Sequence, residues 1–246
     1  MVGAVWILHF LTGKKTILKL KPSCLKLEGP VILPCLGLGV STFVMLSTES
    51  LLSITFTASL ARYGGDLAVG AMTIITSVSQ LVTLPLQGVC QGGQPIISYN
   101  YGAGHGDRVK KTFFLVFSVC MTYTVLFWAA VLLFPSVFAG IFTTNAELSG
   151  YTSWALRIYM AGIFACGAQC SCQQSFMALG QAKVSLLLAC LRKIVLLIPL
   201  ILILPHVLPF DPVFSVFLAE PVSDIAAAVI TTITFLARFN RILEMR

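Results

Sequence analysis

Long apolar runs separated by short polar stretches make up most of this chain. Charge-poor segments of about twenty residues or more, the length of helix that crosses a bilayer core, recur from residue 31 onward. The pattern predicts six transmembrane helices, at residues 31–61, 67–97, 112–142, 148–179, 184–204 and 213–237. Pro85, Pro199 and Pro221 fall inside these segments. A proline lacks the backbone donor of a helical turn, so each predicts a kink.

Composition supports a membrane protein. Apolar residues make up 57% of the chain, charged residues only 10%, and the mean hydropathy is +0.94. A water-soluble protein of 246 residues could not bury so much apolar surface in one core. Backbone groups in lipid need internal partners, so the spans must be helical. We therefore predict an all-α, polytopic protein of the cell membrane, with a six-helix transmembrane lobe over residues 31–246.

The N-terminal region differs from this repeating pattern. Residues 1–12 are apolar but too short to cross a bilayer, and they lack the basic start and cleavage site of a signal peptide. We expect them to be the end of a preceding transmembrane helix. The lysine-rich residues 13–30 would then form a linker.

Lysine and arginine are concentrated in alternate connections between the predicted helices. These connections hold Lys14, Lys15, Lys19, Lys21, Lys26, Arg108, Lys110, Lys111, Lys183, Arg238, Arg241 and Arg246. By the positive-inside rule, the linker, the turn predicted at residues 99–111 and the C-terminus lie in the cytoplasm. The same bias accounts for the net charge of +7, so a nucleic acid partner is not required.

Polar residues recur at helical spacing inside four of the predicted helices, so each presents one polar face. The simplest interpretation is a shared cavity, and we predict that Gln80, Gln87, Gln169 and Gln173 line it. The alternative is that these side chains make interhelical hydrogen bonds that hold the bundle together.

Three carboxylates lie within predicted spans: Glu49, Glu220 and Asp224. An ionised carboxylate at the bilayer centre costs about 2.5–3.5 kcal/mol on insertion scales, and such groups usually bind cations or carry protons. They are therefore the candidates for cation or proton coupling. The alternative is a structural pairing with Arg192 or Lys193, which also fall within a span.

Other kinds of site are not indicated. The stretch Gln91–Lys111 contains five glycines, but their spacing fits neither a dinucleotide fingerprint nor a phosphate-binding loop. The eight cysteines include no zinc-type Cys-x-x-Cys pair, and small thiols in helices usually serve packing. We expect no metal site, no cofactor other than a coupling ion, and no enzymatic activity.

Three motifs occur in order along the chain: Pro95–Lys111 ("PIISYNYGAGHGDRVKK"), Gln173–Pro205 and Leu218–Asp224 ("LAEPVSD"). Together they resemble the multidrug and toxin extrusion (MATE) family, particularly its MepA-type branch. The first is similar to a cytoplasmic loop motif of the family. The residues that carry this similarity are Pro95, Tyr99, Asn100, Gly102, Ala103 and Arg108.

The resemblance implies a transporter of two six-helix lobes joined by a cytoplasmic linker, of which this chain matches the second lobe. It implies antiport, in which uptake of H+ or Na+ drives export of amphipathic, often cationic drugs around a midplane site. Glu49 is similar to an acidic position of the family's seventh helix. The aspartate that several relatives carry in the tenth helix is replaced by glutamines here, including Gln169 and Gln173. A separate first lobe, or a second copy of this chain, would complete the transporter.

Two alternatives stay open at this stage. A lipid-linked oligosaccharide flippase of the same superfamily would share the fold, but it should line its cavity with arginine and lysine to hold pyrophosphate. Only Arg157, Arg192 and Lys193 are available within the spans. The other alternative is a truncated remnant that does not transport.

Overall fold

The computed structural model describes residues 5–6, 9–10 and 29–244. The chain divides into two compact units, Met1–Val44 and Met45–Arg246, and the second unit is described here by itself. The predicted end of a preceding helix (residues 1–12) and the predicted linker (residues 13–30) fall almost entirely outside the described residues. Within those residues the secondary structure is helical and contains no strand, so the all-α class is confirmed.

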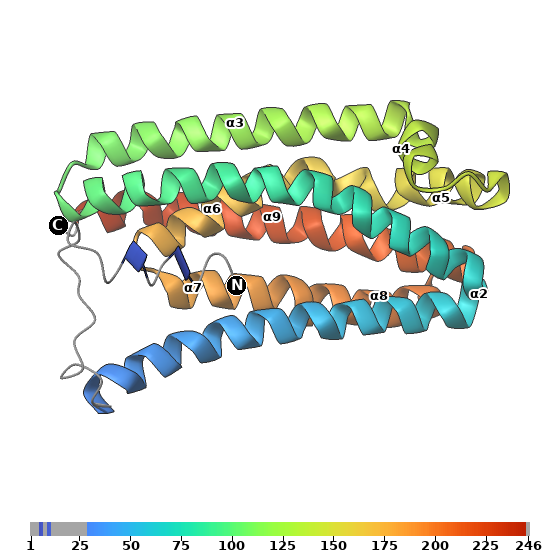
Figure 1. The fold of residues 1–246 in the computed structure, drawn as a ribbon, viewed down its shortest axis with the longest axis horizontal. Helices are drawn as coiled ribbons and strands as arrows, with labels where there is room; N and C mark the ends of the chain where they lie inside the picture. The colour runs from blue at the N-terminus through green and yellow to red at the C-terminus, as the bar shows by residue number, and fades with distance from the viewer. Residues whose placement is uncertain (1–4, 7–8, 11–28, 245–246) are drawn as a thin grey trace. The chain divides into compact units, whose positions relative to one another are not determined.

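The helical segments follow one another with short connections (Figure 1). They are α2 (Gly29–Gly102), α3 (Gly106–Leu133), α4 (Pro135–Phe142), α5 (Ala146–Tyr159), η2 (Met160–Ala165), α6 (Cys166–Ala178), α7 (Ala182–Cys190), η3 (Leu191–Leu197), α8 (Ile198–Val207) and α9 (Pro212–Glu244). Of these, η2 is a 3₁₀ helix and η3 is a π-helix. Stretches long and apolar enough to cross a membrane are found at Ser47–Gly102, Gly106–Leu133, Lys183–Val207 and Pro212–Phe239.

The long helix α2 contains two of the predicted spans, separated by a break at Gly65. This residue has φ 62° and ψ −159°, a backbone conformation that glycine adopts without the steric cost a side chain would add. The break falls between the predicted spans 31–61 and 67–97, as expected. We call residues 45–64 the first arm of α2 and residues 66–102 the second arm.

The third predicted span, 112–142, is wrong in its extent. Helix α3 ends at Leu133, where the Phe134 N–H donates to the Ala130 carbonyl, and Pro135 then begins the short helix α4. Proline cannot continue a helix but suits the first turn of a new one, because that turn's N–H groups have no helical partner.

The fourth and fifth predicted spans are each built from several pieces. Residues 148–179 correspond to α5, η2 and α6, so a 3₁₀ turn interrupts the span. Residues 184–204 correspond to α7, the π-helical η3 and the start of α8, where Pro199 lies in the first turn. A proline ring clashes with the carbonyl four residues earlier in an α-helix. The altered winding of η3 therefore lies where the kink was predicted.

The turn predicted at residues 99–111 is much shorter in the structure. Helix α2 continues to Gly102 and α3 begins at Gly106, which leaves a tight turn with Gly104 at φ 76°. The His105 N–H donates to the Asn100 carbonyl at 2.9 Å and closes the turn. Of the predicted loop motif, Pro95, Tyr99, Asn100 and Gly102 therefore lie in α2, Ala103 in the turn and Arg108 in α3.

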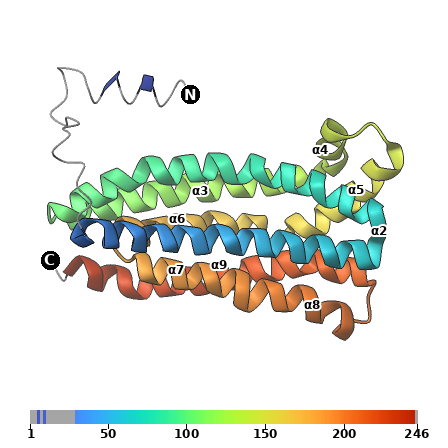
Figure 2. The same cartoon turned by 60° about the horizontal axis from the view of Figure 1, so that its bottom comes forward.

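Helix α9 is the central element of the second unit. The most apolar window of α9 is 61% buried, against 22% for that of α3, and α9 contacts α5, η2, α6, η3 and α8. Figures 1 and 2 show it running beside α6 and α8. Phe235 of α9 packs against Phe113 of α3, with ring centroids 4.6 Å apart. Functional groups on α9 are thus held by neighbours on several sides.

Candidate functional site

A cavity of about 220 Å³ lies among α2, α6, α7 and η3. Its walls carry amides and charges as well as apolar groups, which is unusual for a site at membrane depth. The polar lining includes Glu49 and Gln87 of α2, Gln169 and Gln173 of α6, and Arg192 and Lys193 of η3. Every one of these residues belongs to the second unit.

The π-helix η3 supplies both cations of the cavity wall. Arg192 and Lys193 are consecutive residues, and both line the cavity. The wider winding of a π-helix leaves carbonyl groups without their usual α-helical partners. Here the Ser223 hydroxyl of α9 donates to the Arg192 carbonyl at 3.2 Å. This contact fixes η3 against α9 at the residue whose side chain carries the charge.

Arg192 forms an ion-pair cluster with two carboxylates of α9, which we call the buried triad. Its Nη2 lies 3.1 Å from Glu220 Oε1 and also contacts Asp224 Oδ1. The two carboxylates are four residues apart, which places them on the same face of the helix. The side chains of Glu220 and Asp224 are only 9% and 3% exposed. One guanidinium therefore balances two buried carboxylates, which leaves one excess negative charge when both are ionised.

The buried triad is incompletely satisfied. The Oε2 atom of Glu220 is buried and has no hydrogen-bond partner among the described residues. An unpartnered buried oxygen costs free energy, and more so when it is charged.

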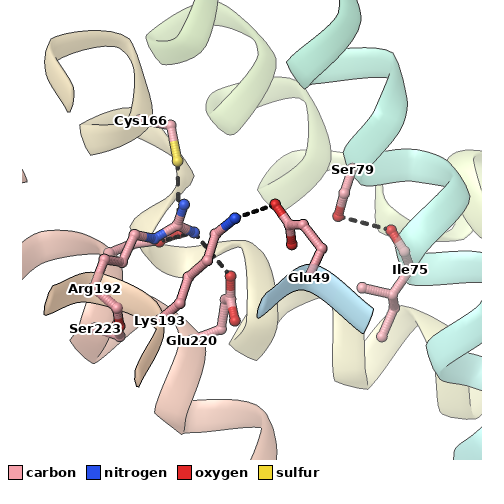
Figure 3. Close-up of polar contacts among 9 residues, drawn as sticks. Glu49, Ile75, Ser79, Cys166, Arg192, Lys193, Glu220 and Ser223 are labelled. Atoms are coloured by element: carbon pink, nitrogen blue, oxygen red, sulfur yellow. Dashed lines mark hydrogen bonds and ion pairs between the residues drawn. The ribbon is translucent and has the colours of Figure 1, made fainter. Parts of the chain in front are cut away.

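Cys166 connects the buried triad with the cavity (Figure 3). Its thiol lines the cavity and donates to Asp224 Oδ2 at an S···O distance of 3.6 Å. One turn earlier, Gly162 lies against α9 so closely that a Cβ there would be 2.7 Å from the Cα of Pro221. Only glycine fits such a contact, and it brings η2 and the start of α6 against the part of α9 that carries the carboxylates.

A second ion pair joins Lys193 to Glu49 of the first arm of α2. We call it the cavity pair. The Lys193 side chain is 14% exposed and the Glu49 side chain 59%. Figure 3 shows Lys193 reaching toward Glu49 while Arg192 points toward Cys166 and Glu220. Adjacent cations of one segment thus hold carboxylates from different helices.

The structure separates the predicted cavity residues into two groups. Gln87, Gln169 and Gln173 line the cavity, whereas Gln80 is exposed on α2 and is not part of its lining. Gln169 is 5% exposed and its Oε1 has no partner among the described residues. The Gln173 amide donates to the Ser185 carbonyl at 3.4 Å, so this side chain also holds α6 to α7.

The three predicted coupling carboxylates are not all in the same environment. Glu49 lines the cavity, while Glu220 and Asp224 lie behind Arg192 and are absent from its lining. The pairing with Arg192 and Lys193, considered as an alternative from the sequence, is present in the structure. The contact of Cys166 with Asp224 was not foreseen, because nothing in sequence spacing relates α6 to α9.

Fold and site together define a multi-pass helical membrane protein with a charged cavity inside one lobe. The sequence profile of the MatE family matches residues 41–203, more than half of the chain. The chain belongs to the MatE family.

The curated relatives of this chain include multidrug export proteins. The multidrug export protein MepA of Staphylococcus saprophyticus is 23% identical over 234 residues, which cover 94% of this chain and 51% of that protein. MepA of Staphylococcus aureus is 26% identical over 200 residues, covering 78% of this chain and 42% of that protein. The chain thus spans about half the length of the curated relatives it matches.

Solved structures agree on the fold. The outward-facing conformation of a multidrug resistance MATE family transporter of the MOP superfamily superimposes with a TM-score of 0.85 at 17% identity. The match covers 99% of this chain and 54% of that one. The prediction of a bundle like one lobe of a MATE transporter is therefore confirmed at the level of the fold.

Proposed function

We propose that this chain is one lobe of a secondary antiporter that exports amphipathic, often cationic small molecules in exchange for protons. The curated relatives are multidrug export proteins. The observation that carries the proposal is the buried triad, in which one guanidinium faces two carboxylates. A buried group with one excess negative charge gains most from taking up a single cation.

Protons suit the buried triad better than Na+. A sodium ion needs a shell of several oxygen ligands. The Arg192 guanidinium already contacts both carboxylates and would repel a second cation placed between them. A proton needs only one lone pair, and Glu220 Oε2 offers one. The charged or titratable groups that act on Glu220 and Asp224 come from several elements: Arg192, Cys166, Tyr159 and, more distantly, Glu49.

Substrate binding would use the cavity and the cavity pair. Glu49 is more than half exposed and lines the cavity, so a cationic substrate can compete with Lys193 for its carboxylate. The glutamine amides offer donors and acceptors, and the apolar lining suits an amphipathic molecule. Neutral substrates would bind through the same amides without displacing Lys193.

Arg192 provides the coupling in this scheme, because it contacts both carboxylates and also lines the cavity. When one carboxylate takes up a proton, a single counter-charge remains for the guanidinium. The cavity wall then becomes more positive and binds a cation less well. By linkage, a bound cation weakens proton binding by the same factor. This reciprocity is the requirement for exchange.

A second lobe is needed for transport in this proposal, because alternating access moves two lobes about one site. A separate first lobe, or a second copy of this chain, would supply it. We place the linker, the Gly104 turn and the C-terminus in the cytoplasm, on the basis of the lysine and arginine distribution.

The flippase alternative is less well supported. Arg192 and Lys193 do line the cavity, but each is already paired with a carboxylate. Arg157 is exposed and is not part of the lining. A pyrophosphate group would have to displace these carboxylates rather than meet free cations.

The test is a transport assay in proteoliposomes that contain either the chain alone or the chain with the first lobe of a MepA relative. Imposed pH and Na+ gradients are applied separately, and ethidium movement is followed by fluorescence. We expect movement driven by the pH gradient only in the two-lobe preparation. Exchange that follows the Na+ gradient alone would contradict proton coupling. Equal activity of the chain alone, without a crosslinked dimer, would contradict the two-lobe scheme.

A further inference from the structure

Three cysteine thiols from three different helices meet beside the cavity. Cys90 of α2 and Cys120 of α3 have their sulfur atoms 3.6 Å apart. Cys170 of α6 packs against the apolar cluster that contains both of these cysteines. We call Cys90, Cys120 and Cys170 the thiol cluster. It shares no residue with the ion pairs described above.

Close packing of α2 against α3 produces this arrangement. Cys90 and Cys120 are 2% and 1% exposed and belong to a small apolar cluster with Leu86 and Val116. One turn after Cys90, a Cβ at Gly93 would lie 2.6 Å from a methyl carbon of Val116. Glycine at this position lets the two helices approach closely enough for their thiols to touch.

The thiol cluster is connected to the cavity through Cys170. This residue is half-buried and lines the cavity, as does Cys166 one turn earlier on the same face of α6. A molecule in the cavity would therefore meet Cys170 first, and Cys90 and Cys120 belong to the buried cluster against which Cys170 packs.

We propose that the thiol cluster is a binding site for trivalent organoarsenicals, which are small, uncharged and amphipathic. Cys90 and one neighbouring thiol would hold the arsenic. The three bonds of trivalent arsenic meet at close to right angles, so it bridges sulfur atoms that are already nearly in contact. A two-coordinate soft metal ion would need its sulfur atoms on opposite sides. Among the described residues, no group of three or more histidine, cysteine or acidic side chains is arranged to hold a metal ion.

The reaction is a condensation without a redox step. An arylarsonous acid, with one carbon and two hydroxyl groups on arsenic, reacts with two thiols. Two As–O bonds break and two As–S bonds form. The thiol protons leave with the hydroxyl groups as two molecules of water. Arsenic and sulfur keep their oxidation states, so no oxidant or reductant is required.

Mass spectrometry of the purified full chain in nanodiscs tests the proposal, with phenylarsine oxide as the probe. In one variant the other cysteines (Cys24, Cys35, Cys166, Cys172 and Cys190) are replaced by alanine, so that the thiol cluster alone remains. We expect one phenylarsenic group per chain to survive excess monothiol and to be released by ethanedithiol. A monothiol competes poorly because the second As–S bond forms within the chain, at high effective concentration.

Replacing Cys90 separates the thiol cluster from adventitious binding. In the same background, Cys90→Ser should lose the retained arsenic, because it removes one thiol of the directly contacting pair Cys90–Cys120. The matched control keeps Cys166, Cys172 and Cys190 but lacks the thiol cluster, and it should retain none. Equal retention with and without Cys90 would overturn the proposal.

A second measurement needs no substitution. On the unaltered chain, phenylarsine oxide should protect Cys90 from maleimide that is added after the chain is unfolded in SDS, as mapped by peptide mass spectrometry. Ethanedithiol should restore the alkylation seen without phenylarsine oxide. Unchanged alkylation of Cys90 after treatment would also overturn the proposal. Neither measurement depends on transport, so the result is independent of the proposed antiport.

Discussion

Arg192 and Lys193 are neighbours in the same π-helical segment, yet they hold their carboxylates in opposite settings. Arg192 faces two side chains that are 9% and 3% exposed, whereas Lys193 faces one that is 59% exposed. In the buried triad, water has little access to the two carboxylates and cannot replace a lost cation. In the cavity pair, water and ligands can reach the carboxylate directly.

The buried triad and the cavity pair therefore differ in how readily their ion pairs can be broken. A buried ion pair contributes little net stability, but removing one partner is strongly destabilising, since the other charge is left without solvent. An exposed pair is worth about 0–1 kcal/mol and is easily exchanged. Under the proposed antiport, the buried triad would hold a proton inside the protein, and the cavity pair would release Glu49 to a substrate.

The largest effect is expected from removing the shared cation. Arg192→Met leaves two buried carboxylates unpaired, so we expect the protein to lose about 3–5 kcal/mol of stability. Lys193→Met is the matched control and should cost no more than about 1 kcal/mol. Thermal unfolding in mild detergent, followed by tryptophan fluorescence, measures both. Equal losses in the two variants would remove the distinction between the buried triad and the cavity pair.

A combined substitution sharpens this result. When Glu220→Gln and Asp224→Asn are added to Arg192→Met, no charge remains in the buried triad. Much of the lost stability should then return. Failure to recover would mean that Arg192 acts through packing of its side chain rather than through charge.

The next effect concerns exchange rather than stability. In the two-lobe preparation, Asp224→Asn leaves the buried triad neutral, because Arg192 then faces only Glu220. The excess negative charge that would bind the proton in the proposed scheme is gone, so we expect proton-driven ethidium transport to be lost while membrane insertion and unfolding temperature are maintained. Asp66→Asn, at an exposed position beside the Gly65 break, is the control. If Asp224→Asn transports ethidium as fast as this control, Asp224 has a structural role and does not take part in proton coupling.

Much of the fold follows from the sequence because the bilayer leaves few options. Apolar length predicts where helices run, and Gly64-Gly65-Asp66 marks the break in α2 at the right place. The extent of the third span was missed because the helix break at Phe134–Pro135 lies within an unbroken apolar run. Hydropathy carries no information about such a break, although the proline was a usable signal.

The candidate site was predictable only in part. A carboxylate in an apolar run stands out because of its cost, which is why Glu49, Glu220 and Asp224 were found. Their partners depend on how α9 packs against η3 and η2, and helical spacing within one segment does not contain that information. The π-helical winding that turns Arg192 and Lys193 to one cavity, and the close contact of Gly162 with Pro221, are properties of the packed lobe.

A smaller effect is expected at the cavity pair. Glu49→Gln, in the two-lobe preparation, keeps the shape of the side chain but removes the charge that attracts a cationic substrate. We expect the KM for ethidium to rise roughly tenfold, which corresponds to about 1.4 kcal/mol, with little change in unfolding temperature. An uncharged substrate serves as the internal control, and its KM should stay the same. Equal changes for both substrates would show that the effect does not arise from charge.

The smallest effect is expected at Cys166, which links the cavity to Asp224. A thiol is a weak donor, so losing its contact with Asp224 should cost about 0.5 kcal/mol, or roughly a twofold lower rate of proton-driven export. Cys166→Ala removes the donor, while Cys166→Ser retains one and should restore part of the rate. Cys190→Ala, at a half-buried cysteine outside the cavity lining, is the control.

Initial rates at several ethidium concentrations distinguish a change in turnover from a change in KM. If Cys166 holds Asp224 and does not contact the substrate, only turnover should fall. A rise in KM as large as that of Glu49→Gln would instead place Cys166 among the substrate contacts, and the separation between the buried triad and the cavity pair would no longer hold.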